Sequence, residues 1–144
     1  MSDLARFCTR FLPCLLAAIT VAAICPGCSD GRLPIQGEVT IDGKPIEEGT
    51  ISLEPADGKG PTTGGKIVAG KYQLSGGAAP LPGKKIVRIF GVRKTGRRVH
   101  DGFSGVMVDE IKPCTPDVYN ARTTLSCEVA ADGPKQIDFH LKSP

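Results

Sequence analysis

Apolar and polar residues alternate along the chain from Ile35 onward, and turns rich in Gly and Pro interrupt the alternation. A period of two is typical of β-strands that bury one face. We find no helical period in this part of the chain. The pattern predicts about seven short strands, and therefore an all-β fold, a seven-stranded antiparallel β-sandwich. These strands are expected within residues 35–41, 49–55, 66–68, 71–74, 84–92, 122–129 and 135–141.

The inward faces of the predicted strands follow from the same alternation. The expected core residues are Ile35, Val39, Ile41, Ile51, Leu53, Tyr72, Leu74, Val87, Ile89, Leu125, Cys127, Val129, Ile137, Phe139 and Leu141. The Asp42-Gly43 pair predicts a tight hairpin turn, and Ala69-Gly70 a second one. Residues 93–118 show no clear alternation, and we expect them to form a long irregular stretch.

The N-terminus has a different pattern. Arg6 and Arg10 precede the uncharged residues 11–29, and the apolar part of that stretch ends at Ile24. A basic start, an apolar middle and small residues at the end are typical of a secretory signal. The apolar part is shorter than the roughly 20 residues that a membrane-spanning helix needs. We therefore expect an N-terminal signal helix that directs export.

The end of this stretch resembles the processing site of bacterial lipoproteins, because a small residue, Gly27, directly precedes Cys28. The prediction is a signal peptide over residues 1–27, a tether over 28–34, a domain over 35–144, and lipidation of Cys28. Cys25 stands where such sites usually have an aliphatic residue, so cleavage before Cys25, simple cleavage and an uncleaved anchor stay open. A metal- or redox-type C-x-x-C is disfavoured, since no second ligand pair and no βα context accompany it.

Composition narrows the possible partners. Apolar residues make up 40% of the chain and charged residues 23%, which is typical of a globular domain. The net charge of +3 gives no reason to expect a nucleic-acid partner. Aromatic residues are only 5%, with no Trp, so a stacking surface for carbohydrate is not evident.

Cys114 and Cys127 remain once the signal peptide is removed. In an exported protein an even pair indicates a disulfide, and Cys127 is expected to face inward near the stretch that holds Cys114. We therefore predict a Cys114–Cys127 disulfide, with two separate buried thiols as the alternative. A catalytic cysteine needs a nearby histidine, but His100 falls in the irregular stretch and His140 is expected to point outward.

Charged residues supply two further candidates. Residues 93–102 contain four basic residues and His100, and form either a solvated loop or a patch for an anionic glycan, a lipid headgroup or an acidic partner. The acidic residues lack the spacing of a calcium loop, so we predict no metal site and no cofactor. These residues are Asp42, Asp57, Asp101, Asp109 and Glu110.

The segment GEVTIDGKPIEEGTISLEPADGKGPTTGGKIVAGKYQL, residues 37–74, resembles the opening of carboxypeptidase-regulatory-like domains, which have the transthyretin-like (prealbumin-like) sandwich. More narrowly, residues 35–142 resemble a group of short planctomycete-type lipoproteins. Lys85 stands where their pattern usually has Tyr. The matching motifs are turn and core features, so the resemblance implies a fold rather than a ligand. They lie at residues 37–49, 55–58, 70–74, 82–85, 108–110 and 119–120.

Residues and resemblance together predict an exported, lipid-anchored β-sandwich domain that faces the periplasm or the cell exterior. We expect it to be a structural or binding module of the cell envelope and not an enzyme, because the hydrolase of this fold carries a C-terminal Tyr-Arg-Gly-Ser signature and paired histidines that this chain lacks. The expected partners are the membrane, through the lipid anchor, and a glycan or protein at the cell surface, with no nucleic acid. The alternative is a carbohydrate- or peptide-binding accessory domain with a specific ligand.

Overall fold

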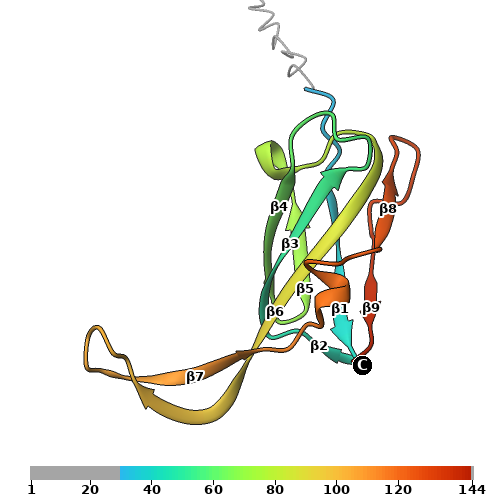
Figure 1. The fold of residues 1–144 in the computed structure, drawn as a ribbon. Helices are drawn as coiled ribbons and strands as arrows, with labels where there is room; N and C mark the ends of the chain where they lie inside the picture. The colour runs from blue at the N-terminus through green and yellow to red at the C-terminus, as the bar shows by residue number, and fades with distance from the viewer. Residues whose placement is uncertain (1–29, 144) are drawn as a thin grey trace, which may run out of the picture.

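The computed structural model describes residues 30–143. The predicted signal peptide, the alternative site Cys25 and the lipidation site Cys28 lie outside these residues. The described chain is all-β, with two short 3₁₀ helices, η1 (Gly76–Ala78) and η2 (Asp117–Tyr119) (Figure 1). Its nine strands are β1 (Ile35–Ile41), β2 (Lys44–Pro45), β3 (Glu48–Pro55), β4 (Thr63–Val68), β5 (Lys71–Leu74), β6 (Gly83–His100), β7 (Met107–Pro113), β8 (Ser126–Val129) and β9 (Phe139–Leu141).

The strands are hydrogen-bonded in the order β2-β1-β5-β4-β3-β6-β7, with β8 paired to β6 and β9 paired to β1, and this sheet does not close on itself. All of these pairs are antiparallel except β1 and β9, which run parallel. Each of the seven predicted strands has a counterpart, although β8 and β9 begin only at Ser126 and Phe139 and are shorter than predicted. The two additional strands are β2, which has only two residues, and β7, which lies in the stretch expected to be irregular. None of the described helices is long and apolar enough to cross a membrane.

Strand β1 joins two parts of the sheet. Its first half, from Ile35 to Glu38, pairs with β5, and its second half pairs with β9. At the switch, Ile137 donates its N–H to the Gln36 carbonyl at 2.8 Å. A Cβ atom added to Gly37 would collide with the carbonyl of Ile137. Only glycine lets the chain before β9 cross β1 this closely.

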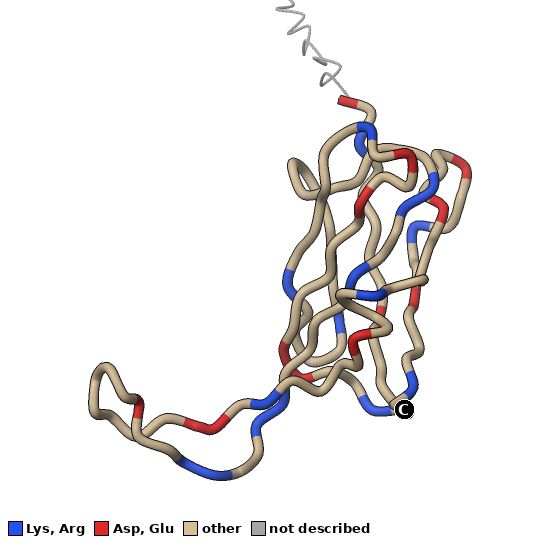
Figure 2. The backbone as a smooth tube through the Cα atoms, viewed as in Figure 1, with Lys and Arg blue, Asp and Glu red and all other residues tan. Residues whose placement is uncertain are grey.

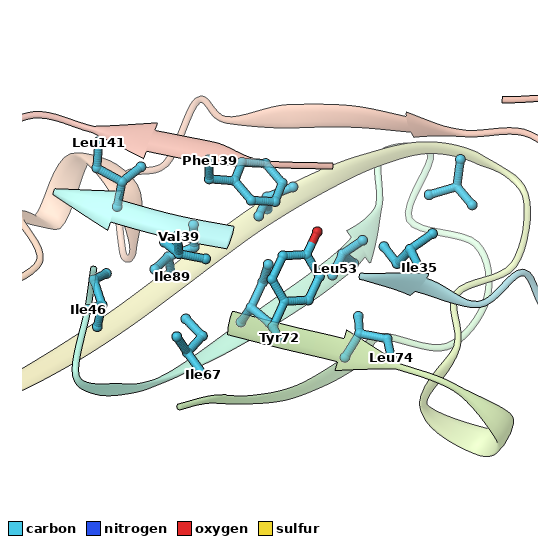
Figure 3. Packing of buried hydrophobic residues seen from close by; sticks show 13 residues of the cluster. Ile35, Val39, Ile46, Leu53, Ile67, Tyr72, Leu74, Ile89, Phe139 and Leu141 are labelled. Atoms are coloured by element: carbon cyan, nitrogen blue, oxygen red, sulfur yellow. The ribbon is translucent and has the colours of Figure 1, made fainter. Parts of the chain in front are cut away.

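The core lies between the inward faces of these strands, where side chains from β1, β5, β6 and β9 point toward one another (Figure 3). The Tyr72 and Phe139 rings are neighbours, with centroids 6.1 Å apart. Each fully buried Val, Leu, Ile or Phe side chain stabilises the fold by about 1.5–3 kcal/mol through the hydrophobic effect. The buried cluster consists of Ile35, Val39, Ile46, Ile51, Leu53, Ile67, Tyr72, Leu74, Val87, Ile89, Val129, Phe139 and Leu141.

Eleven of these thirteen residues were predicted from the alternation, and Ile46 and Ile67 were not. Lys85 is also buried, at 4% exposure, between Pro55 of β3 and Cys127 of β8 in the strand register. The aliphatic stem of a lysine can cover apolar surface. The stem of Lys85 therefore packs in the interior of the domain.

Both predicted hairpin turns are confirmed. Asp42 and Gly43 have φ values of 51° and 78°, and Ala69 and Gly70 have φ values of 49° and 78°. Two consecutive residues with positive φ define the type I′ turn that matches the twist of an antiparallel pair. In both turns the second residue is glycine, which adopts this conformation at little cost.

Candidate functional site

Strands β6 and β7 continue past the body of the domain as a two-stranded ribbon, residues 92–113 (Figure 1). The pairing of β6 with β3 ends at Val92, which lies opposite Glu48. From there β6 pairs only with β7, as far as His100 opposite Met107. Beyond Val92, neither ribbon strand has a second neighbouring strand within the described residues.

The expectation that residues 93–118 are irregular is therefore wrong for residues 93–100 and 107–113, which are strands. The alternation of apolar and polar residues does not reveal these strands, for two physical reasons. The ribbon packs against no core, so neither of its faces needs to be consistently apolar. The register also shifts between Lys94 and Arg98, and a bulge of this kind interrupts any period of two.

Side-chain contacts across the ribbon hold its two strands together. Lys94 Nζ lies 2.9 Å from Asp109 Oδ2, and the Thr95 hydroxyl donates to Glu110 Oε2 at 2.6 Å. The hydrogen bond and the charge of Lys94 lower the pKa of the Asp109 carboxyl. The hydrogen bond from Thr95 is the main cause of the lowered pKa of Glu110. These carboxylates are thus already engaged inside the ribbon.

The loop at the tip of the ribbon, residues 101–106, is shaped by Asp101. Its carboxylate accepts hydrogen bonds from the backbone N–H of Phe103 at 3.2 Å and from the hydroxyl of Ser104 at 2.6 Å. These bonds, that of Ser104 first, lower the pKa of Asp101. The loop leaves Phe103 fully exposed, at 101%. Other exposed apolar residues of the ribbon are Val106, Met107, Val108 and Ile111.

Charge is distributed unequally over the ribbon. Basic residues lie mainly on the β6 side and acidic residues on the β7 side (Figure 2). Among residues 30–143, Arg93, Arg97 and Arg98 form no salt bridge, and Arg98 donates from Nη2 to the Met107 carbonyl at 2.7 Å. The ribbon therefore combines exposed apolar side chains at its tip with guanidinium groups behind the tip that form no salt bridge.

A shallow groove lies at the base of the ribbon, on the outward face of β4, β3 and β6. Cross-strand pairing arranges its surface in two rows, Lys66–Thr50–Phe90 and Val68–Glu48–Val92. Val68 is 61% exposed and Phe90 is 39% exposed. The groove is lined by Glu48, Gly49, Thr50, Lys66, Ile67, Val68, Phe90 and Val92.

The carboxylates of this groove lack ionic partners. Glu47 and Glu48 are exposed, and the part of the chain that the structure describes contains no salt bridge to either. Lys94, on which the charges of both glutamates act, is already bonded to Asp109. The groove is therefore an apolar surface with unpaired carboxylates beside one row and Lys66 in the other.

The structure contradicts the predicted Cys114–Cys127 disulfide, because both residues are free thiols. Cys114 donates its N–H to the Gly91 carbonyl at 2.9 Å, whereas Cys127 pairs with Lys85. Both cysteines thus lie along β6, opposite positions six residues apart, which is about 20 Å at the rise of a strand. A disulfide requires Cα atoms within about 7 Å. The alternative of two separate thiols, each half-buried, fits this structure.

The remaining predicted residues are dispersed. His100 Nδ1 lies 3.3 Å from the Gly105 carbonyl, and His140 Nδ1 lies 2.9 Å from the Thr40 hydroxyl. Neither ring contacts a cysteine. Asp57 accepts the N–H of Lys59 at 3.0 Å, as expected for a turn residue. Across residues 30–143, no cluster of three or more His, Cys, Asp and Glu side chains could hold a metal ion.

The apolar half of the candidate site was missed from the sequence. A usable indication was present: residues 102–108, GFSGVMV, are uncharged within an otherwise charged stretch. The groove had no such indication, because Val68 and Phe90 reach the same face only through the pairing of β4, β3 and β6.

Neither a protein-family model nor a curated protein matches this chain. Among solved structures, a 9R-lipoxygenase from Cyanothece PCC8801 is similar over 79% of this chain, with 13% sequence identity and a TM-score of 0.31. This chain spans 17% of the length of the lipoxygenase chain. The matched protein is an enzyme, which contradicts the expectation that this chain is not one, and that expectation is withdrawn. At this TM-score the likeness carries no argument about an activity of this chain.

Proposed function

We propose that this chain is an exported protein, held at the cell envelope by a lipid on Cys28, and that its domain is a transthyretin-like β-sandwich acting as a binding module. The ribbon is its recognition element. One observation carries this proposal: the ribbon leaves the body of the domain and presents Phe103 fully, and its apolar neighbours in part, to water.

The energetics of the ribbon favour a binding role. An isolated two-stranded hairpin is at best marginally stable in water, because it buries little apolar surface. Exposed apolar patches at such positions are typical of interaction sites. A partner that covered Phe103 and Val106 would stabilise the ribbon by about 25 cal/mol for each Å² of apolar surface removed from water.

The arrangement of the two ends of the domain supports presentation away from a membrane. Near the start of the described chain, Arg32 donates from Nη1 to the carbonyls of Gly77 and Ala79, at 3.0 and 2.9 Å. These bonds hold the predicted tether beside η1. The ribbon leaves the domain at the opposite end (Figure 1). A lipid on Cys28 would therefore hold one end near the membrane and direct the ribbon outward.

Of the two ligand classes considered from the sequence, a polypeptide partner is favoured over a carbohydrate. Carbohydrate sites normally stack sugar rings on exposed Trp or Tyr, but Tyr72 is buried at 3% exposure and Tyr119 is partly buried against the core. The ribbon instead offers two free strand edges and an apolar tip, which suit β-strand addition or insertion into an apolar surface of another chain.

Two measurements on the full-length chain in its native cells test the proposal. The intact mass of protein extracted from membranes should correspond to a start at lipidated Cys28, and Cys28→Ser should release the chain from the membrane. A photocrosslinking amino acid at position 103 should give a covalent adduct. The same group at Lys59, an exposed residue of a loop outside the ribbon and the groove, serves as the control. An unmodified Cys28 refutes the anchor, and no adduct from position 103 refutes the role of the ribbon.

A further inference from the structure

We infer that the partner of the ribbon is a second copy of this chain, with the ribbon of each copy lying in the groove of the other. The inference rests on the proposed role of the ribbon as a binding element. It starts from a coincidence in one domain: an exposed apolar tip, centred on Phe103, and an exposed apolar groove, centred on Phe90 and Val68. Each is a surface that a soluble domain normally covers.

The charges of the two surfaces are complementary. Arg93, Arg97 and Arg98 project from the ribbon without ion-pair partners in the described chain, whereas Glu47 and Glu48 border the groove in the same condition. The complementarity rests on these arginines and glutamates alone. Lys66 lies in the other row of the groove, but Asp109 and Glu110 of the ribbon are already bonded to Lys94 and Thr95. Such complementarity fixes the register of an interface and excludes wrong partners.

The geometry excludes an intramolecular version of this contact. The groove lies at the base of the ribbon, and the ribbon runs away from it (Figure 1). The stretch of β6 from Val92 to His100 spans about 26 Å at the rise of an extended strand. The tip therefore reaches only the groove of another molecule. In a twofold-symmetric pair the two contacts would be identical, and the assembly would close at two copies.

An anionic membrane is the other surface that an apolar tip with basic neighbours could fit. Membrane binding explains fewer of the observed features than pairing with a second copy does. The ribbon also carries Asp101, Asp109 and Glu110, which an anionic surface would repel. A membrane at the tip would also leave Phe90 and Val68 of the groove exposed, whereas a second copy covers both apolar surfaces at once.

The test uses the full-length chain, co-expressed in two differently tagged forms, with the photocrosslinking amino acid at position 103. We expect an adduct of twice the monomer mass that contains both tags. The crosslinked peptide should map to residues 48–50, 66–68 or 90–92 of the other copy. The same group at Lys59 should give no such adduct.

Charge reversal tests the predicted register. Arg97→Glu and Glu48→Lys should each abolish the twofold-mass adduct, because each places like charges in contact. When both copies carry both substitutions, the opposite charges meet again and the twofold-mass adduct should return. Lys135→Glu, which changes an exposed charge away from both surfaces, should leave the adduct unchanged. All three positions are exposed, so each variant should still fold, as circular dichroism can show.

Each other outcome overturns the inference. An adduct with a lipid or with a different protein refutes the second copy but leaves the ribbon as a binding element. No adduct at all refutes both proposals. A twofold-mass adduct that persists in Arg97→Glu and Glu48→Lys, or that maps outside the groove, refutes the contact between ribbon and groove.

Discussion

The carboxylate of Asp42 accepts hydrogen bonds from the backbone N–H of Ser143 at 3.1 Å and from its hydroxyl at 2.6 Å. The first hairpin turn therefore holds the C-terminal end of the described chain. These bonds, with that of the Ser143 hydroxyl first, lower the pKa of Asp42, and the charges of Lys142 and Lys44 act in the same direction.

This lowered pKa gives a pH-dependent prediction. A carboxyl whose pKa is lower in the folded state stabilises the fold above its unfolded pKa of about 4, and the contribution is lost as the pH falls through the folded pKa. Asp42→Asn should therefore unfold more easily than the wild type at neutral pH, and the difference should shrink as the pH falls below about 4. Urea unfolding of both proteins across this range measures it. A difference that does not change with pH would show that the bond to Ser143 is not formed.

Tyr72 is expected to be the more important tyrosine for stability. Its hydroxyl donates to the Ile137 carbonyl at 2.7 Å from within the core, and burial raises its pKa well above the usual range, so the donor proton is kept. Tyr72→Phe should destabilise the domain by about 1–2 kcal/mol, because the carbonyl of Ile137 loses its side-chain donor. Denaturant titration measures this change.

Tyr119 provides the control for this substitution. Its hydroxyl accepts the N–H of Lys142 at 3.2 Å in an exposed setting, where water can replace the lost bond. Tyr119→Phe should therefore cost less than Tyr72→Phe. An equal or larger loss in Tyr119→Phe would contradict the assignment of the two roles.

The core was predictable from the sequence, and the candidate site mostly was not. Alternation finds Val39 or Ile89 because each lies on a strand with one buried face, and this burial imposes the period of two. Inside the ribbon no face is buried, so its residues are free of that constraint and its strands leave no period. Thr95 and Glu110, which join the two ribbon strands, lie 15 residues apart, and only the strand pairing brings them together.

The wrong disulfide prediction has a related cause. The predicted disulfide between Cys114 and Cys127 follows from two facts: the chain is expected to be exported, and two cysteines remain after the signal peptide. These facts indicate that a bridge is possible, but not that the two positions lie close together. The decisive information is the register of β8 along β6, which places Cys127 opposite Lys85 while Cys114 remains beside Gly91. This register depends on long-range pairing and is not encoded in the local spacing of the cysteines.

Gly37, the one glycine of β1, should not tolerate a side chain. A Cβ atom at this position collides with the backbone of Ile137, which cannot move without breaking the link between β1 and the chain before β9. Gly37→Ala should therefore lower the stability by about 1–3 kcal/mol, as expected for overpacking. Thermal or denaturant unfolding measures the loss.

Gly102→Ala is the matched control for Gly37→Ala. No atom lies within 4 Å of an added Cβ at Gly102, so the same chemical change there should leave the stability unaltered. If both variants unfolded alike, the close crossing at Gly37 would not exist.

Gly43→Val tests the first hairpin turn by a different mechanism. A Cβ atom added to Gly43 would meet no other atom, so glycine is needed at this position only because the backbone φ is 78°. A β-branched residue adopts this conformation only with strain, and the cost should be about 1–3 kcal/mol. Gly77→Val, at a position that also has open space, should be tolerated better, since no positive φ is required there. An unchanged melting temperature in Gly43→Val would show that the turn has another geometry.

The two thiols give the last prediction, because their separation along β6 requires both to be free. Burial raises the pKa of the Cys127 thiol to about 11, so almost none of it is thiolate at neutral pH. Iodoacetamide should therefore leave Cys127 unmodified in the folded protein and modify it once the protein is unfolded. In protein kept oxidised throughout, alkylation after unfolding should label both Cys114 and Cys127, as read by peptide mass spectrometry. A peptide linked through the two residues would require β8 to pair with β6 some six residues away from its present register, and would contradict the arrangement of the sheet at this edge.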